Sequence, residues 1–370
     1  MAADVFFHSL EHAAEDELTP IDLRPGLTEL VGRLGLTGAA GPASQWGLKV
    51  HLGAQGLPPA VEPAWARTVA EALAAPGATD PSRGTFCFDT LSITTSGLDQ
   101  VDTHLGLAKV KGYGTTGNGL PYLVADGLGQ GDPPSASPSS GQGITPASAL
   151  VRAAGICLLT PVRPHPHTGL LGAVINLGVG LVDRPSKILL HEDIKPVVNT
   201  PLCAGCGSCQ AVCLFDAIAI NAGRAFIDHE KCTGCGECMN VCFMAGISPE
   251  EAAGIPLFQK KVAAAALVAR DSVTGGKPDR AGFFNLLFRQ DRRSGVARAR
   301  GRERLGDVGV LASRDPVALD QATWDLIVQR MDGPLAKWSG FLQEPGPLLE
   351  RAEELGLGGR GYRMVEVSWG

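Results

Sequence analysis

Eight of the ten cysteines stand in two runs in the middle of the chain, at a spacing typical of iron ligands. The first run holds Cys203, Cys206, Cys209 and Cys213, and the second holds Cys232, Cys235, Cys238 and Cys242. Both runs read C-x2-C-x2-C-x3-C. Thiolates at this spacing bind [4Fe-4S] clusters, whose chemistry is the transfer of single electrons. The sequence therefore predicts two iron–sulfur clusters.

The fourth cysteine of each run lies too far along the chain to join its three neighbours, so it reaches the other cluster. We expect one cluster on Cys203, Cys206, Cys209 and Cys242, and the other on Cys213, Cys232, Cys235 and Cys238. Two four-cysteine zinc sites are the alternative, although zinc sites usually show separated C-x2-C pairs. Leu214 and Phe243 stand where proline commonly follows the fourth cysteine. Proline supplies no ligand, so both ligand sets stay complete.

The residues around the cysteine runs predict a small domain of their own. Between the runs, apolar and polar residues alternate on both sides of Asn221-Ala222-Gly223, as in a β-hairpin. We therefore expect an α+β, two-cluster ferredoxin-like domain over about 197–248. Cys87 and Cys157 lie apart from it in apolar runs, where buried and inert thiols are expected.

Short apolar runs alternate with helical patterns over the rest of the chain, which indicates an α/β fold with a largely parallel sheet. The expected strands are 47–53, 84–91, 121–127, 155–162, 282–288 and 307–315, and the expected helices are 62–75, 249–270 and 316–331. The inserted ferredoxin-like domain makes this α/β domain discontinuous, with a first part at 1–196 and a second part at 249–370.

Polar side chains follow several of these strands at the point where each strand ends. Ligands of open α/β sheets bind at the carboxyl ends of the strands, so these residues form a candidate site. We expect catalytic roles for His51, Asp89, Asp126, His165 and His167, and cofactor contacts from Asn176, Gly178 and Gly180. The alternative is that such residues only cap the following helices, which is what we expect of Asp315 before Pro316.

Three further segments have more than one interpretation. The glycines of 163–180 allow close approach of a ligand or cluster, but their spacing is not the dinucleotide-binding pattern. The segment 289–304 carries seven arginines, either as a solvated loop or as a docking patch for an acidic electron carrier or an anionic substrate. The Pro/Ser/Gly-rich segment 129–143 is either a surface excursion or a lid.

Composition excludes several classes of protein. The chain has 370 residues, 44% hydrophobic and 19% charged, which is ordinary for a globular protein of about two domains. Its net charge of −6 argues against a nucleic-acid partner. The N-terminus does not read as an export signal, and the apolar run at 169–182 is too short to span a bilayer. We therefore expect a cytoplasmic protein.

The order of several motifs resembles the domain-of-unknown-function family 362, iron–sulfur centre proteins that carry an inserted two-cluster ferredoxin. The stretches that carry the resemblance are "LKVHLG", "FCFDT", "LVADGLGQG", "GLLGAVINLGVG", both cysteine runs and "VGVLASRDPVALDQATWDLI". The resemblance implies the fold and the clusters, but no settled reaction. Ile175 stands where the family tends to have a lysine, and Arg163 and Lys187 are candidates to replace that cation.

These features together predict a reductase that feeds low-potential electrons from two [4Fe-4S] clusters to a small molecule or cofactor in the α/β domain. His165 or His167 would be its proton donor, and a ferredoxin or flavodoxin its electron partner. Two alternatives remain open. One is an electron-transfer module that docks a larger redox partner through 289–304, and the other is a cluster-dependent maturation or sensor protein.

Overall fold

The structure is a computed structural model, which describes most of the chain. The described residues are 2–10, 22–41, 43–53, 55–56, 58–78, 80, 83–94, 97–126, 143–249, 254–288 and 305–367.

Within these ranges, eight strands form one sheet in the order β14-β1-β13-β12-β5-β2-β3-β4. The strands are β1 (Ala3–Ser9), β2 (Trp46–Lys49), β3 (Thr85–Asp89), β4 (Tyr122–Val124), β5 (Gly155–Pro161), β12 (Ala281–Leu287), β13 (Gly309–Ser313) and β14 (Tyr362–Glu366). Every pairing in the sheet is parallel except those that β13 makes with β1 and β12. The prediction of an α/β fold with a largely parallel sheet is therefore confirmed.

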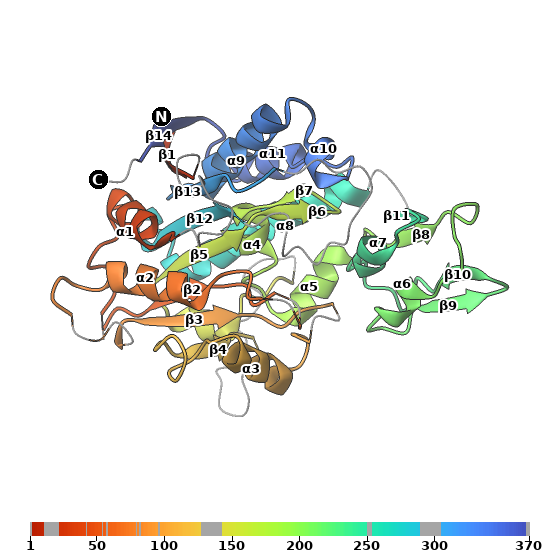
Figure 1. The fold of residues 1–370 in the computed structure, drawn as a ribbon, viewed down its shortest axis with the longest axis horizontal. Coiled ribbons are helices and arrows are strands. Elements are labelled where there is room, and N and C mark those ends of the chain that lie inside the picture. The colour runs from red at the N-terminus through yellow and green to blue at the C-terminus, as the bar shows by residue number, and fades with distance from the viewer. Residues whose placement is uncertain are drawn as a thin grey trace.

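Helices cover both faces of this sheet (Figure 1). One face packs against α4 (Ala173–Gly178), α8 (Gly254–Thr274), α9 (Pro316–Met331), α10 (Leu335–Ser339) and α11 (Gly346–Glu354). The other packs against α1 (Arg24–Arg33), α2 (Pro63–Leu73) and α3 (Val101–Val110). The remaining elements of this part are α5 (Arg184–His191), the hairpin β6 (Arg163–His165) and β7 (Gly169–Leu171), and the 3₁₀ turns Ser148–Arg152 and Pro278–Arg280.

The alternation along β5 explains why a continuous apolar run forms a central strand. Ile156 and Leu158 join the core on the α8 side, whereas Cys157 and Leu159 join the core on the α2 side. Side chains of a strand point alternately to its two faces, so a strand covered on both faces must be apolar throughout. Cys157 and Cys87 are fully buried, as expected of these two thiols.

The cysteine runs lie in a smaller unit, residues 196–249, which projects from one end of the main body (Figure 1). We call it the cysteine unit. Its elements are β8 (Pro196–Val198), α6 (Ser208–Ala211), β9 (Ile218–Asn221), β10 (Arg224–Ile227), α7 (Glu237–Val241) and β11 (Ile247–Pro249). Strands β9 and β10 form the predicted hairpin around Ala222 and Gly223, both with positive φ. Its first and last strands, β8 and β11, pair with each other.

The expected strands and helices outside the cysteine unit are all present, with ends shifted by a few residues. The described part of the helix expected at 249–270 is α8 (Gly254–Thr274). The sequence analysis had no prediction for β1 and β14, which extend the sheet beyond β13. Within the described ranges, every helix is too short or too polar to span a bilayer.

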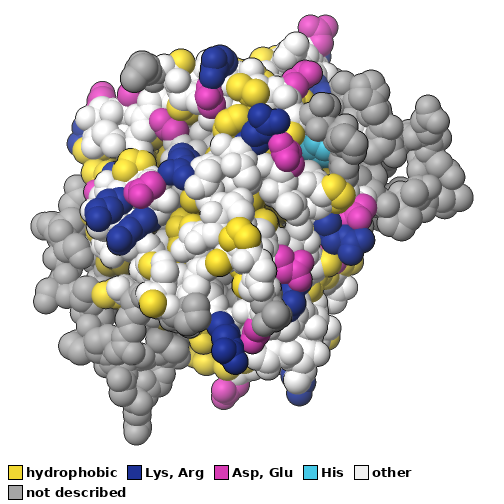
Figure 2. All heavy atoms as spheres, turned by 90° about the vertical axis from the view of Figure 1, so that its left-hand side faces the viewer, with side chains coloured by type: hydrophobic (Ala, Val, Ile, Leu, Met, Phe, Trp, Pro, Cys, Tyr) yellow, Lys and Arg dark blue, Asp and Glu magenta, His cyan; other side chains and the backbone are white. Residues whose placement is uncertain are grey.

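Figure 2 looks onto the side of the main body that faces away from the cysteine unit. Basic and acidic side chains are interspersed there, with hydrophobic side chains scattered among them. This face therefore has the mixed character of a solvated surface rather than that of a charged docking patch.

Candidate functional site

The cysteine unit contains two cavities, and each is lined by one of the two predicted ligand sets. Cys203, Cys206, Cys209 and Cys242 line one cavity. Cys213, Cys232, Cys235 and Cys238 line the second. The fourth cysteine of each run thus joins the first three of the other. We call the four cysteines of the first cavity the outer set, because Cys206 is exposed, and the four cysteines of the second cavity the inner set.

Backbone amides point at the sulfurs of both sets. Gly205 and Ala225 donate N–H bonds to Cys203 Sγ over 3.4 Å, and Gly246 donates to Cys242 Sγ over 3.3 Å. In the inner set, the N–H of Ala217 lies 3.4 Å from Cys213 Sγ. Such N–H groups stabilise a negatively charged sulfur, so these contacts favour thiolates that carry a metal.

The largest effects of burial on the thiols fall on Cys235 and Cys238 of the inner set. It raises the pKa of Cys235 to about 11, and it also raises that of Cys238, whose side chain is almost fully buried. At the outer set, hydrogen bonds with the side chain and backbone of Ser208 lower the pKa of exposed Cys206. Only deprotonated thiols bind metal, so a metal in the inner set would displace protons from these sulfurs. Among the described residues, no three His, Cys, Asp or Glu side chains converge on a point suited to a single metal ion.

Two glycines allow the loop that carries the inner set to pack closely against the main body. A Cβ on Gly234 would lie 2.1 Å from the carbonyl oxygen of His191, and one on Gly236 would lie 2.8 Å from His167 Nε2. Both glycines also have positive φ, so a side chain would add backbone strain to the overlap. The loop of the inner set therefore contacts the main body directly.

On the main-body side of this contact lies a cluster of three histidines. The ring centroids of His165 and His167 are 5.6 Å apart, and those of His167 and His191 are 6.2 Å apart. Phe258 of α8 packs against His167 and His191. Burial lowers the pKa of His165 to about 3 and that of His191 to about 4, and it lowers that of His167 well below the usual range. All three rings are therefore neutral near pH 7.

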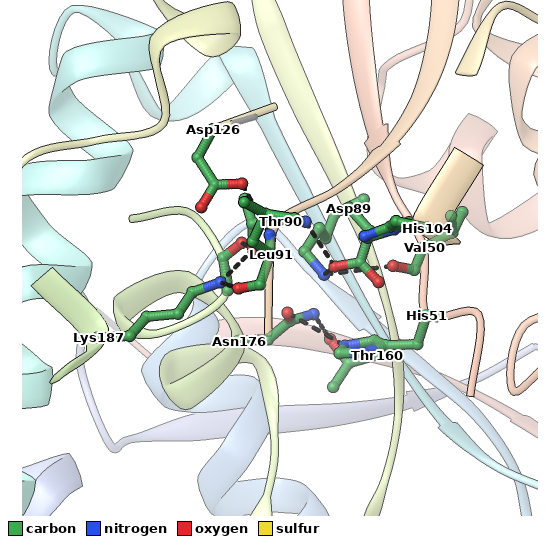
Figure 3. A network of polar contacts seen from close by, with 12 residues as sticks. Val50, His51, Asp89, Thr90, Leu91, His104, Asp126, Thr160, Asn176 and Lys187 are labelled. Carbon is green, nitrogen blue, oxygen red and sulfur yellow. Dashed lines mark hydrogen bonds and ion pairs between the residues drawn. The ribbon is translucent and has the colours of Figure 1, made fainter. Parts of the chain in front are cut away.

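Beyond the histidine cluster, the predicted residues His51, Asp89, Asp126 and Asn176 come together in a polar network at the carboxyl edge of the sheet (Figure 3). His51 Nε2 lies 3.2 Å from Asn176 Oδ1, and Asn176 Nδ2 donates to Thr160 Oγ1 over 2.9 Å. Burial, aided by the charge of Lys49, lowers the pKa of His51 well below the usual range. Because an amide oxygen only accepts, neutral His51 carries its proton on Nε2 and leaves the Nδ1 lone pair available.

The second part of the network is a buried ion pair between neighbouring strands. Lys49 Nζ, at the end of β2, donates to Asp89 Oδ1, at the end of β3, over 2.6 Å. The same oxygen accepts the N–H of Thr90 over 2.8 Å. Burial alone would raise the pKa of Asp89, but the surrounding positive groups, Lys49 foremost, and the hydrogen bond from Lys49 together hold the pKa well below the usual range. Asp89 is therefore ionised at any pH at which the protein would function.

A second lysine joins the network from α5. Lys187 Nζ donates to Thr90 Oγ1 over 2.7 Å and to the carbonyl oxygen of Leu91. Asp126 Oδ1 accepts the N–H of Leu91 over 2.7 Å, whereas its buried Oδ2 has no hydrogen-bond partner among the described residues. Burial lowers the pKa of Lys187 to about 8 and raises that of Asp126. Lys187 therefore holds a proton that it can release near neutral pH.

The remaining predicted positions have contacts within the chain. A Cβ on Gly178 would meet the carbonyl oxygen of Val262 at 2.4 Å, and one on Gly180 would meet that of Asn176 at 2.3 Å. Gly178 thus lets α4 pack closely on α8, and Gly180 lies directly against Asn176 of the network. Asp315 accepts N–H bonds from Val317 and Ala318, which confirms the prediction of a helix cap. The arginine-rich segment 289–304, and all of 129–143 except Gly143, lie outside the described residues.

The sequence analysis missed Lys49, Thr160 and His191 as members of this region. Lys49 has a recognisable signal, because it is the one charged residue in the apolar strand "GLKVHL" and a buried lysine needs a partner. Thr160 and His191 have no such signal. Their positions follow from how β5 and α5 pack in the fold.

Comparisons with known proteins give one match. The family model described as "Domain of unknown function (DUF362)" matches residues 47–325, which is more than half of the chain. A search of curated proteins and a search of solved structures each returned no match.

Proposed function

The chain belongs to the DUF362 family, and from its two cysteine cavities and the polar network beside them we propose that it is an iron–sulfur reductase. In this proposal, residues 197–248 act as a two-cluster ferredoxin-like domain. The network of the main body holds a small molecule that receives the electrons.

The residues present fit [4Fe-4S] clusters. Each predicted ligand set lines one cavity of its own, and its cysteines have the run spacing of cluster ligands rather than the separated pairs usual for zinc. N–H groups already point at the sulfurs, as expected around a cluster with a net negative charge. When bound, the clusters would supply single electrons at low potential.

The positions of the two sets favour one direction for the proposed electron transfer. The outer set has the exposed Cys206, so an electron carrier such as a ferredoxin or flavodoxin would meet this end. The inner set lies against His167 and His191 through Gly234 and Gly236, so it faces the main body. With clusters bound, the outer set would face the electron carrier, and the inner set would face the histidine cluster and the network beyond it.

Within the network, Lys187 and His51 have complementary roles. Lys187 holds a proton on Nζ with a pKa of about 8, which suits it to give that proton to a substrate that has taken up an electron. We place this role on Lys187 rather than on His165 or His167, because burial keeps both of those rings neutral near pH 7. The lone pair on His51 Nδ1 accepts a hydrogen bond and orients the substrate.

The observation that carries this proposal is the lining of each cavity by one complete ligand set. Anaerobic purification followed by iron and sulfide analysis tests it, with an expected content of two four-iron clusters per chain. Cys206→Ser and Cys235→Ser should each disturb one of the two clusters. Cys87→Ser, a buried thiol outside both sets, is the matched control and should keep the full iron content. About two zinc ions per chain, with no iron, would overturn the proposal.

A further inference from the structure

Asp320 is a buried carboxylate that holds the start of α4. It lies on α9, it is 2% exposed, and its two oxygens accept the first N–H groups of α4. Oδ1 accepts the N–H of Ala173 over 2.7 Å, and Oδ2 accepts that of Val174 over 2.8 Å. Gly172, the residue before the helix, has no side chain to make these bonds, and a Cβ there would lie 2.4 Å from Asp320 Oδ1. A carboxylate from another helix thus takes the place of an N-cap side chain.

Hydrogen bonds, and no cation among the described residues, satisfy this carboxylate. Its third bond comes from Asn285 of β12, whose Nδ2 donates to Asp320 Oδ1 over 2.8 Å and to Thr323 Oγ1 over 2.9 Å. Asn285 Oδ1 is buried and has no partner within the described ranges. A buried charge without a cation and a buried carbonyl without a donor are both costly. The start of α4 is therefore fixed by directed hydrogen bonds in addition to packing.

The helix that Asp320 holds carries Asn176 of the polar network. α4 has six residues, all of them buried, and a helix this short is not stable by itself. The N–H of Asn176 donates to the carbonyl oxygen of Gly172 over 3.0 Å. The amide of Asn176 lies between His51 and Thr160, with Oδ1 3.2 Å from His51 Nε2 (Figure 3). One helical turn therefore joins the end that Asp320 anchors to the amide that contacts His51.

We propose that Asp320 is a positioning residue for the network, which anchors α4 so that Asn176 Oδ1 accepts the proton on His51 Nε2. This inference rests on the proposed function, in which His51 orients the substrate through Nδ1, and adds the residue that keeps this lone pair available. Without the anchor, Asn176 shifts and the His51 proton is shared between Nε2 and Nδ1. A ring protonated on Nδ1 does not accept a hydrogen bond there.

The tautomer of His51 measures this role directly. Nitrogen-15 NMR at pH 7.5 of the anaerobically purified, oxidised protein with labelled histidines gives the ratio of the two forms, and His51→Gln identifies the signal. Asp320→Asn should lower the ratio of Nε2-protonated to Nδ1-protonated His51 at least about threefold. Asn offers one oxygen where Asp offers two, so Ala173 or Val174 loses its acceptor, and one hydrogen bond corresponds to about a fivefold ratio.

Two further variants separate positioning from a general loosening of the core. Thr323→Val, the matched control, removes a buried hydrogen bond from the same helix but leaves the three bonds of Asp320 in place, so it should keep the wild-type ratio. Gly172→Ala covers the case in which Asp320→Asn does not fold. It keeps the carboxylate but places a Cβ against Oδ1, so it should change the His51 ratio in the same direction as Asp320→Asn.

Two results would overturn the inference. A wild-type ratio in folded Asp320→Asn, or in Gly172→Ala where Asp320→Asn does not fold, would show that packing alone places α4. An equal fall in Thr323→Val would show that any loss of a core hydrogen bond releases His51. Iron content, measured on the same samples, distinguishes this inference from the proposed function: a wild type without iron whose His51 ratio still depends on Asp320 would refute the reductase and uphold the positioning role.

Discussion

Asp89→Asn is the substitution that tests the polar network most directly. It removes the negative partner of Lys49, whose side chain is only 1% exposed, while it keeps an oxygen that can accept the N–H of Thr90. Removing one partner of a buried ion pair leaves the other charge uncompensated and costs about 3–5 kcal/mol. We therefore expect Asp89→Asn to lower the free energy of unfolding by this amount.

The double variant Lys49→Met/Asp89→Asn separates the interaction between Lys49 and Asp89 from the contacts that each side chain makes with other groups. Met is close to Lys in volume and carries no charge, so the double variant should lose less stability than the two single variants combined. Urea unfolding followed by tryptophan fluorescence measures these differences, since Trp46 is 2% exposed and lies on the same strand as Lys49. Asp4→Asn breaks an exposed pair with Arg363 and serves as the control, with an expected cost of about 0–1 kcal/mol.

The dependence on pH follows from the lowered pKa of Asp89. Its ionised form is more stable in the folded than in the unfolded chain, so its contribution is present above the unfolded pKa of about 4. That contribution is lost as the pH falls further. The difference in the free energy of unfolding between wild type and Asp89→Asn should therefore become smaller below about pH 4. Additive effects of the two single variants, or a cost for Asp89→Asn no larger than that for Asp4→Asn, would refute the reasoning.

Three further predictions concern the other parts of the site. Nitrogen-15 NMR should find His51 neutral at pH 6.5 with its proton on Nε2. In Asn176→Leu the proton should no longer prefer Nε2 over Nδ1, and a charged ring in wild type at this pH would contradict the assignment. Gly236→Ala should destabilise the protein more than Gly223→Ala, because both have positive φ but only Gly236 faces an atom within 3 Å, and equal melting temperatures would argue against the seating contact. The rate of the proposed reduction should fall as the pH rises past about 8, because Lys187 then loses its proton. A rate that stays constant up to pH 10 would show that Lys187 is not the proton donor.

Local sequence patterns predicted the elements of the fold, because periodicity and turn residues are local properties. The hairpin around Ala222 and Gly223, the strands flanking the core and the cap at Asp315 all follow from neighbouring residues. Strands β1 and β14 did not. They belong to the sheet only because the two ends of the chain meet beside β13, and that pairing is between residues far apart in sequence.

The candidate site was predictable in part of its membership but not in its connections. The rule that ligands bind at strand ends brings His51, Asp89 and Asp126 to one edge, and the structure places them there. It does not reveal that Lys49 pairs with Asp89 or that Lys187 reaches Thr90 from a helix about a hundred positions away. It also gives no warning that burial leaves His165 and His167 neutral, since burial depends on what α8 covers.

The pairing of β8 with β11 has a consequence for how this chain is assembled. Val198 and Ile247 lie opposite each other, so the chain leaves the main body and returns to it at adjacent positions. Everything between these two residues can fold around its own small core without requiring the host to hold distant ends together. The cysteine unit is thus an insertion that begins and ends at neighbouring positions. A short turn that joins Val198 to Ile247 would remove it whole, leaving the eight-stranded sheet continuous and uncovering His167 and the carbonyl of His191, which Gly236 and Gly234 now contact.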